Sequence, residues 1–316
     1  VGDSLIWLGE REYIRKLGLR LRYVADLWSY DARDLRRALP RGGAVLLHGG
    51  GNFGDLWLGH QVLREKVATE LADYKLIQLP QSVYFNDEAR ASEANQILGA
   101  HPDLHVFLRD SLSMERAALQ LPSVSVAYCP DMALGWSPPA STKLAAPDRQ
   151  RPRVLVIARK DMEAASTLAD VDSEWISGAQ TTVTDWWPRG RTAAAWWAAR
   201  IASRIYLLYV KVRRRMRFLP GPTADKLGAM AIDAISDANI AGALHLYSSA
   251  DVIVVDRLHA HILAGLCGRP HVALDNSYKK VSAIFHDYSG GLSTATYASD
   301  IDEARSATHE LVSEAR

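Results

Sequence analysis

The chain has 316 residues, of which 48% are hydrophobic and 23% are charged, and its formal net charge at pH 7 is +1. This composition is ordinary for a globular protein with a full core, and the length favours two domains. The near-neutral charge provides no basic field, so we expect no nucleic-acid partner. Two cysteines, Cys129 and Cys267, are too few for a disulfide framework and predict buried thiols in a reduced, cytoplasmic compartment.

The N-terminal segment carries no recognisable targeting signal. Val1-Gly2-Asp3-Ser4 lacks the basic region and the apolar region of a signal peptide. No charge-free apolar run reaches the roughly 20 residues of a membrane-spanning helix. Because the chain begins without an initiator Met, we expect an upstream strand outside this numbering.

Short apolar runs alternate with longer amphipathic stretches along the chain. The runs are continuous, which is typical of strands buried on both faces of a parallel sheet. This alternation predicts an α/β protein of two Rossmann-like, doubly wound domains. The predicted strands are residues 21–25, 44–48, 76–79, 105–108, 125–128, 153–158, 243–247, 252–255 and 271–274. The predicted helices are residues 56–71, 87–98, 110–119, 225–240, 260–268 and 300–316.

A stretch rich in Pro, Ala and Ser, residues 137–152, interrupts this pattern and predicts an inter-domain linker. We therefore expect an N-terminal domain at residues 1–138 and a C-terminal domain at residues 152–316. A basic helical insert at about residues 192–220 is expected within the second domain. The two domains are expected to face each other across a cleft.

Polar groups follow most of the predicted strands. In open α/β sheets, ligands bind beyond the carboxyl ends of the strands, so these groups are expected to gather at one edge of each sheet. In the first half they are Gln81 and Ser82 after residues 76–79, and Arg109 after residues 105–108. In the second half they are Arg159 after residues 153–158, and Arg257, Leu258 and His259 after residues 252–255.

A glycine-rich segment follows the predicted strand at residues 44–48. Gly49, Gly50 and Gly51 allow a tight turn that brings bare backbone amides close to an anion or a sugar. The segment matches neither Gly-x-Gly-x-x-Gly nor a P-loop, so nucleotide-cofactor readings are weak. Asn52 and Asp55 could bond sugar hydroxyls, and Asp55 could act as a general base. The alternative is that Asp55 only caps the following helix.

Arg257 and His259 lie where a buried strand ends and a helix begins. A cation near a positive helix terminus is costly unless an anion binds there, and a guanidinium matches a carboxylate or a phosphate. His259 can exchange a proton near neutral pH. The alternative is that Arg257 pairs with Asp251 or Asp256 and that His259 is structural. No carboxylate or cysteine cluster accompanies His259, so we expect no metal site.

Residues 196–218 contain seven Arg or Lys and no acidic residue. On a helix, the apolar residues of this segment form one stripe. They are Trp197, Ile201, Ile205, Leu208, Val212 and Met216, flanked by Arg200, Arg204 and Lys211. Such a helix can lie in the interface of an anionic membrane, peripheral to the inner face of the plasma membrane. The alternative is that the stripe packs on its own domain.

Six blocks of this sequence resemble the polysaccharide pyruvyl transferase family. The segment from His48 to Trp57, His-Gly-Gly-Gly-Asn-Phe-Gly-Asp-Leu-Trp, is similar to the family's glycine-rich signature. Later blocks follow in the family's order: Leu79-Pro80-Gln81-Ser82, Arg109-Asp110-Ser111, Pro130-Asp131 and Arg257-Leu258-His259-Ala260. Gly2-Asp3 resembles the tail of the family's N-terminal Asn-x-Gly-Asp block. Ser277-Tyr278-Lys279-Lys280 departs from a common Tyr-x-x-Lys block by one position.

The resemblance implies a two-lobed fold similar to GT-B glycosyltransferases, in which phosphoenolpyruvate donates pyruvate to a sugar as a ketal. It implies no cofactor, and the acceptor is a sugar of a surface glycan or of its lipid-linked precursor. By matching position, Arg257 binds the donor, His259 transfers a proton, and Arg159 is a second anion clamp. The remaining expected substrate-binding residues are Leu258, Gly50, Gly51, Asn52, Gln81, Ser82 and Arg109.

Two other functions remain open from the sequence. One is a GT-B glycosyltransferase that uses a nucleotide sugar, for which Asp275 could hold a ribose. The other is a non-catalytic protein that binds a glycan or a lipid, which the presence of both Arg257 and His259 disfavours. The reading of a pyruvyl transferase depends on Arg159 and Arg257 meeting across a gap between the lobes and holding one small dianion.

Overall fold

The computed structural model describes residues 1–140, 142, 150–159, 167–186, 190–216, 221–275 and 279–314, without the side chains of residues 190, 191, 214 and 221–226. Two compact units divide the chain. The N-terminal unit consists of residues 6–135 and 195–237, and the C-terminal unit consists of residues 1–5, 136–194 and 238–316. Residues 195–237 thus join the N-terminal unit, whereas the sequence placed the basic insert in the C-terminal domain.

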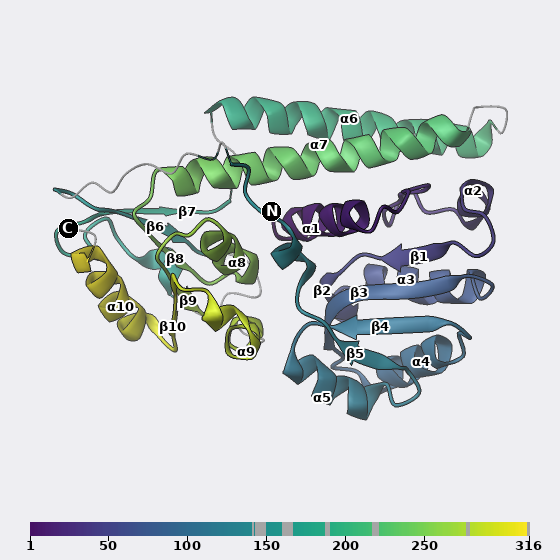
Figure 1. Cartoon of the computed structure of the whole chain (residues 1–316), viewed down its shortest axis with the longest axis horizontal. Helices are drawn as coiled ribbons and strands as arrows, with labels where there is room; N and C mark the ends of the chain where they lie inside the picture. Colours follow the sequence, from purple (N-terminus) through teal and green to yellow (C-terminus); the bar gives the residue numbers. More distant parts are fainter. Residues whose placement is uncertain are drawn as a thin grey trace. The chain divides into compact units, whose positions relative to one another are not determined.

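The N-terminal unit contains a parallel sheet with helices alongside it (Figure 1). The strand order is β1-β3-β4-β5, and β2 also pairs with β3. Its strands are β1 (Ala44–Leu47), β2 (Gly50–Gly54), β3 (Lys75–Tyr84), β4 (Leu104–Leu108) and β5 (Val126–Tyr128). Its connecting helices are α3 (Leu58–Glu70), α4 (Glu88–Gly99) and α5 (Ser111–Gln120). Leu76 and Leu108 are fully buried in the core between these layers.

The C-terminal unit contains a second parallel sheet, with strand order β10-β9-β8-β6-β7. Its strands are β6 (Arg153–Ile157), β7 (Gln180–Thr184), β8 (Val252–Val255), β9 (His271–Leu274) and β10 (Ala295–Ala298). Its helices include α8 (Leu258–Leu266), α9 (Lys280–Asp287) and α10 (Ile301–Glu314). All four residues of β8 have no exposed surface, as expected for a central strand covered on both faces.

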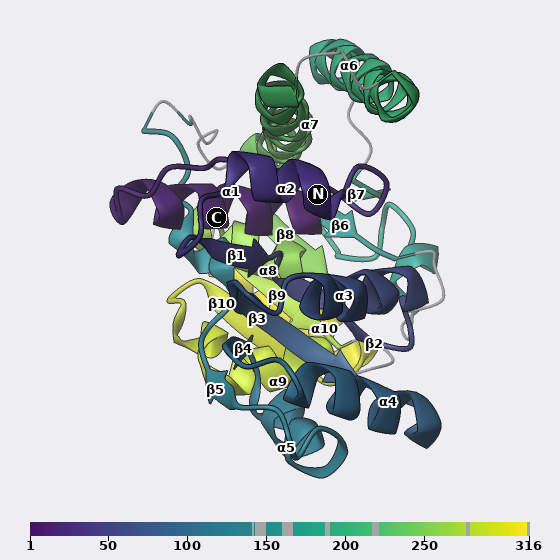
Figure 2. The same ribbon diagram turned by 90° about the vertical axis from the view of Figure 1, so that its right-hand side faces the viewer.

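Four further helices complete the described structure: α1 (Gly2–Lys16), α2 (Ala32–Ala38), α6 (Gly190–Arg215) and α7 (Gly221–Ser248). Short 3-10 turns are formed by η1 (Met132–Gly135), η2 (Leu168–Asp170) and η3 (Ser289–Gly291). Helices α6 and α7 run side by side in both views (Figures 1 and 2). Asp233 of α7 accepts hydrogen bonds from the Trp7 indole and the Arg11 guanidinium of α1. These contacts explain why residues 195–237 belong with the N-terminal unit.

The sequence predicted the parallel α/β class correctly, and seven predicted strands coincide with observed ones. Two strand predictions are wrong. Residues 243–247 continue α7 because their apolar side chains extend a helical pattern that no proline interrupts. Residues 21–25 are not a strand, and Leu21 is exposed rather than part of a buried apolar run. The facing of the two domains across a cleft stays a prediction.

One helix in the described ranges is long and apolar enough to cross a membrane, by length and composition alone. It is residues 227–248 of α7, with 39% of its apolar window buried. Asp233 and Asp237 interrupt this helix, so it is not a charge-free apolar run of the kind that the sequence was expected to lack. Within this helix, Asp233 bonds to α1, and Asn239 donates a hydrogen bond to the Ser4 hydroxyl at 2.9 Å. These polar contacts are those of a helix packed against protein.

Candidate active site

Three neighbouring strands of the C-terminal sheet end at the same level. In the parallel registers, Ile157 of β6 lies beside Thr184 of β7 and beside Val255 of β8. The residues that follow these strands therefore emerge at one edge of the sheet, and they include Asp185, Arg159 and Arg257. The edge is the carboxyl end of the strands, where ligands bind in open α/β sheets.

Arg257 begins helix α8 at this edge, and its guanidinium lies 3.2 Å from the Asp185 carboxylate. Both side chains keep about a quarter of their surface exposed, at 23% and 28%. The buried carboxylate of Asp256 accepts the backbone N–H of Arg159 at 2.9 Å, which fixes the chain where Arg159 leaves β6. Asp251, the other acid considered as a partner for Arg257, forms an ion pair with Arg153 instead.

His259 lies in the first turn of α8 and is partly buried, while the neighbouring Leu258 is buried. The backbone of Gly2 packs directly on the His259 ring: a β-carbon at Gly2 would lie 2.8 Å from Nδ1. The family-like residues at the start of the chain and at the start of α8 are therefore neighbours within the C-terminal unit. A residue larger than glycine at position 2 would displace or rotate the imidazole.

His261 and His271 form a separate, buried pair in the C-terminal unit. The His261 Nδ1 lies 2.7 Å from His271 Nε2, and His261 Nε2 lies 2.7 Å from the Ser289 hydroxyl. Burial lowers the pKa of His261 to about 3, helped by His271, and lowers the pKa of His271 to about 4. Both imidazoles are therefore neutral at pH 7. Within the described ranges, no three His, Cys, Asp or Glu side chains form a group that could hold a metal ion.

The glycine-rich segment of the N-terminal unit forms strand β2. Gly54 has a φ of +131°, and a β-carbon there would lie 1.7 Å from the Tyr84 carbonyl oxygen of β3, so only glycine fits. Gly50 also has a positive φ, +129°. The amides expected to face a ligand are partly engaged within the protein, because Asn52 N–H donates to Gln81 and Gly54 N–H donates to Gln61. Substrate binding by Gly50 and Gly51 stays a prediction.

Asn52 and Gln81, both predicted to bind substrate, contact each other. The Asn52 side-chain oxygen accepts hydrogen bonds from Gln81 Nε2 at 3.0 Å and from Arg64 Nη2 at 2.9 Å. Arg64 is buried under β2, and its other donors bind the side-chain oxygens of Gln78 and Gln61. Burial lowers the pKa of Arg64 to about 9, so it remains charged at pH 7. Arg64 was not identified from the sequence, because a helical arginine resembles a surface residue.

Ser82 and Arg109 belong to a buried polar cluster behind the strand ends. Arg109, 2% exposed, pairs with Asp131 and donates from Nε to the Ser82 hydroxyl at 2.9 Å. That hydroxyl donates to Asp110, whose carboxylate caps α5 by accepting Ser113 N–H at 2.7 Å. The cluster braces β3, β4 and the start of α5. The predicted substrate contacts of Ser82 and Arg109 remain untested.

Asp55 does not cap α3. The residue at that cap is Trp57, which makes no side-chain capping bond. The Asp55 carboxylate instead accepts the backbone N–H groups of Asn86 and Asp87, both at 2.7 Å, and so holds the turn after β3. The capping alternative from the sequence is therefore wrong, and a role for Asp55 in proton transfer stays a prediction.

His48 and Glu10 form a dyad at the carboxyl end of β1 that the sequence did not reveal. The Glu10 carboxylate, 3% exposed, lies 2.8 Å from His48 Nδ1 and accepts Gly49 N–H at 2.8 Å. The His48 side chain keeps 36% of its surface exposed. A buried carboxylate on one ring nitrogen fixes the tautomer and supports protonation at the other, as in catalytic acid–base pairs. The sequence signal that could have identified His48 is its position directly before the glycine-rich segment.

Ser277 and Tyr278 of the shifted tyrosine block lie outside the described ranges. Asp275, considered as a ribose ligand, caps α9: its carboxylate accepts the Ser282 hydroxyl and the backbone N–H groups of Val281 and Ser282.

A family model and two curated relatives point to one family. The family model described as "Polysaccharide pyruvyl transferase" matches residues 1–278. EpsO of Bacillus subtilis, provisionally named a pyruvyl transferase, is 28% identical over 292 residues, which cover 92% of this chain and 83% of that protein. Pyruvyl transferase 1 of Schizosaccharomyces pombe is 28% identical over 296 residues, which cover 90% of this chain and 66% of that protein. A crystal structure of an uncharacterized Klebsiella pneumoniae protein shares the fold, with a TM-score of 0.54 at 14% identity over 94% of this chain and 88% of that chain.

Proposed function

Because the chain belongs to the polysaccharide pyruvyl transferase family, we propose that it transfers the pyruvyl group of phosphoenolpyruvate to a sugar as a ketal and releases phosphate. The observation that carries this proposal is the shared edge of β6, β7 and β8, at which Arg159 and Arg257 each lie two residues beyond the paired Ile157 and Val255. Phosphoenolpyruvate has a carboxylate and a phosphate, and two guanidinium groups at one sheet edge suit such a dianion.

On the donor, Arg257 and Arg159 hold the two anionic groups, and His259 gives a proton to the methylene carbon. Protonation makes the adjacent carbon electrophilic, so a sugar hydroxyl adds there. Phosphate leaves with the electrons of its C–O bond, and a second hydroxyl closes the ketal. Electrostatic stabilisation by the two cations contributes more than the proton transfer itself. Asp185 holds the Arg257 guanidinium in place until the donor arrives.

On the acceptor, two hydroxyl protons must be removed, and the net reaction delivers one to the donor carbon and one to the departing phosphate. We propose that Asp55 removes the proton of the hydroxyl that adds first and that His48 removes the proton of the hydroxyl that closes the ketal. The Glu10 carboxylate favours the His48 tautomer with its proton on Nδ1, which leaves Nε2 as the base. The same carboxylate stabilises the imidazolium that forms when Nε2 takes a proton.

Imidazole rescue tests the assignment of His48. His48→Ala should lower turnover by about a hundredfold or more, the low end for loss of a general base. Added imidazole should restore part of that turnover, and more basic imidazoles should restore more. Glu10→Gln, which keeps a group able to accept Gly49 N–H, should lower turnover and leave the donor KM unchanged. A His48→Ala protein with wild-type turnover, or with a loss that no imidazole relieves, would remove His48 from proton transfer.

The rival function, nucleotide-sugar glycosyl transfer, loses its main support from Asp275, whose carboxylate already caps α9. Thermal protection separates the candidates. Phosphoenolpyruvate at millimolar concentration should raise the melting temperature, and uridine nucleotides should not. Protection by the nucleotide alone would favour the glycosyltransferase, and protection by neither would favour a non-catalytic binding protein.

For the acceptor, we propose a sugar of a surface glycan, carried on a lipid-linked precursor and met in the cytoplasm, where phosphoenolpyruvate is available. We propose no cofactor beyond the donor itself. Phosphate release from phosphoenolpyruvate, screened against β-galactosides, β-glucosides and N-acetylmannosaminides, tests the proposal. Release that depends on one sugar class supports it, and release from none of them at saturating donor contradicts it.

A further inference from the structure

Helix α6 exposes its apolar residues instead of burying them. The six side chains of the predicted stripe are all open to solvent. Their exposed fractions are 56% for Trp197, 56% for Ile201, 63% for Ile205, 61% for Leu208, 38% for Val212 and 49% for Met216. The buried residues of the helix are a different set, with Ala199, Val210 and Arg213 on the opposite flank. The alternative that the stripe packs on its own domain is therefore wrong.

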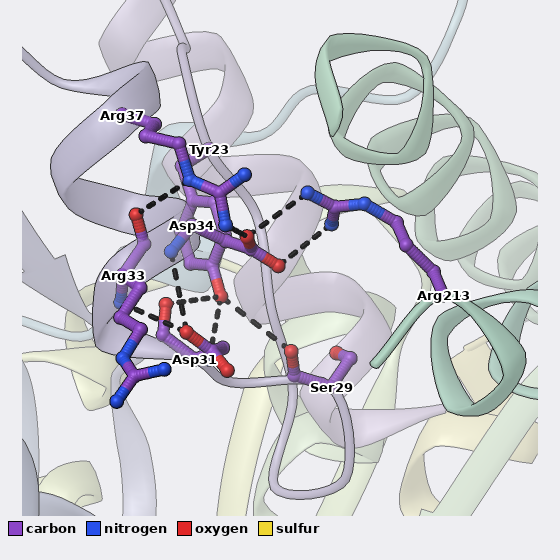
Figure 3. A network of polar contacts seen from close by, with 7 residues as sticks. All are labelled: Tyr23, Ser29, Asp31, Arg33, Asp34, Arg37 and Arg213. Atoms are coloured by element: carbon purple, nitrogen blue, oxygen red, sulfur yellow. Dashed lines mark hydrogen bonds and ion pairs between the residues drawn. The ribbon is translucent and has the colours of Figure 1, made fainter. Parts of the chain in front are cut away.

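Contacts on the buried flank fix which side of α6 faces outward. Arg213 reaches Asp34 near the start of α2 with two parallel bonds, Nη1 to Oδ2 at 2.6 Å and Nη2 to Oδ1 at 2.9 Å (Figure 3). Asp34 also binds Arg37 one turn further along α2. On the same flank of α6, seven residues before Arg213, Tyr206 packs so closely on α7 that a β-carbon at Gly228 would lie 2.5 Å from its hydroxyl. These contacts hold the helix by the flank opposite the stripe.

The network that receives Arg213 is itself well anchored. Asp31 caps α2 by accepting the backbone N–H groups of Arg33 and Asp34, and its own N–H donates to the Tyr23 hydroxyl at 2.9 Å (Figure 3). The Arg213 side chain is nine-tenths buried and pairs with Asp34, so its charge does not contribute to the exposed face of α6. These contacts within the N-terminal unit therefore fix which face of α6 points outward.

The outward face of α6 is cationic as well as apolar. Arg200, Arg204, Lys211 and Arg215 are exposed, and residues 190–216 contain no Asp or Glu. At 100° per residue, these four cations lie along one border of the stripe. Arg200 stacks over Trp196 at 4.7 Å, which places an aromatic ring and a cation together near one end of the helix. Aromatic residues and cations beside an apolar stripe are typical of helices that lie in a membrane interface.

We propose that the outward face of α6 docks on the surface of an anionic lipid bilayer, with the helix axis parallel to the membrane plane. The charge pattern selects this occupant. Two copies of the chain meeting through this face would bring like cations together, whereas anionic headgroups neutralise the cations while acyl chains cover the stripe. The proposal rests on exposure and charge and does not depend on pyruvyl transfer.

Vesicle co-sedimentation of the full chain tests the docking face. The wild-type chain should sediment with phosphatidylglycerol vesicles at low salt and at least tenfold less with phosphatidylcholine vesicles, and salt should weaken binding by screening the headgroups. The variant with Ile205→Ser and Leu208→Ser should bind phosphatidylglycerol at least tenfold more weakly. Leu119→Ser is the matched control, since Leu119 is 84% exposed on α5 of the same unit, and it should bind as the wild type does.

A second variant separates charge from apolar contact. Arg200→Gln, Arg204→Gln and Lys211→Gln together should abolish the preference for phosphatidylglycerol while leaving far-ultraviolet circular dichroism and melting temperature unchanged. Wild-type binding in either multiple variant, or no vesicle binding by the wild type, would overturn the proposal. Light scattering without lipid provides the last arm: a dimer that the Ile205→Ser, Leu208→Ser variant turns into a monomer would assign the face to a second copy.

Discussion

The contact between Gly2 and His259 allows the proton-donor role to be tested without removing the histidine. A Gly2→Ala substitution puts a methyl group 2.8 Å from Nδ1 and 3.3 Å from Cγ of His259. An ordinary contact needs at least 3.4 Å, so the ring must shift by about 0.6 Å or rotate about its side-chain bonds. Because Leu258 and the backbone of α8 are buried, the ring moves rather than the helix.

The expected result is a loss of turnover without a loss of stability. A misplacement of about 1 Å in a reacting group costs about a hundredfold in rate, so Gly2→Ala should lower kcat about tenfold to a hundredfold. Position 2 opens helix α1, and alanine is the better helix former by up to about 1 kcal/mol, so the melting temperature should not fall. The assay is phosphate release from phosphoenolpyruvate with a productive acceptor, measured beside a thermal melt.

Gly291→Ala is the matched control. A β-carbon at Gly291 meets no atom within 4 Å, and this residue lies in the same unit as His259. The control should keep wild-type turnover. If Gly2→Ala also kept turnover within twofold of the wild type, the position of the His259 ring would not matter to the reaction, and its role as proton donor would be refuted.

Three further predictions follow from individual contacts. Asp185→Asn removes the carboxylate 3.2 Å from Arg257, which competes with the donor for that guanidinium. Because the pair is partly exposed, the competition is weak, and donor binding measured by calorimetry should tighten only slightly, with a Kd lower by about twofold to fivefold. Arg109→Met leaves a buried carboxylate unpaired and should lower the free energy of unfolding in urea by about 3–5 kcal/mol. His261 and His271, whose pKa values in the fold are about 3 and about 4, should cost stability as pH falls below about 6.5, by about 1.4 kcal/mol per pH unit for each ring.

Controls for these predictions come from exposed counterparts. Arg36 pairs with Asp73 on the surface, so Arg36→Met should change stability by less than about 1 kcal/mol. The acid sensitivity should weaken in a His261→Gln variant and persist when the exposed His309 is replaced by Gln. Weaker donor binding by Asp185→Asn would contradict the role given to that carboxylate. Equal losses of unfolding free energy for the two arginine variants would contradict the role of the buried pair. The same acid sensitivity with and without His261 would contradict the role of the histidine pair.

Most of the strands could be predicted from the sequence because strands buried on both faces of a parallel sheet appear as unbroken apolar runs. The runs at residues 252–255 and 271–274 coincide with β8 and β9 residue for residue. Strand β7, Gln-Thr-Thr-Val-Thr, is polar at four of its five positions and left no such run. Strand β2 is largely glycine, so the sequence suggested a loop where backbone pairing with β3 makes a strand.

The site was predictable where residues follow an apolar strand and invisible where they meet through the fold. Arg159, Arg257 and His259 were singled out because they follow predicted strands, and their roles stay predictions. The family resemblance, read in part from the block at residues 257–260, is confirmed by the match over residues 1–278. Glu10 and His48 are 38 positions apart in the sequence, and no local sequence pattern predicts their contact. Asp185 follows the polar strand β7 and was missed with it. The exposed stripe of α6 was visible as a pattern, but only the fold decides which way it faces.

The claim on which the account depends is that the acceptor sugar gains a pyruvyl ketal from phosphoenolpyruvate. Mass spectrometry of the acceptor after incubation with phosphoenolpyruvate labelled with carbon-13 in the pyruvyl group measures this directly. The account predicts a labelled product heavier by one pyruvate less one water, formed in equal amount to the phosphate released and absent with His259→Ala. An acceptor that remains unlabelled while a nucleotide sugar modifies it would contradict the account.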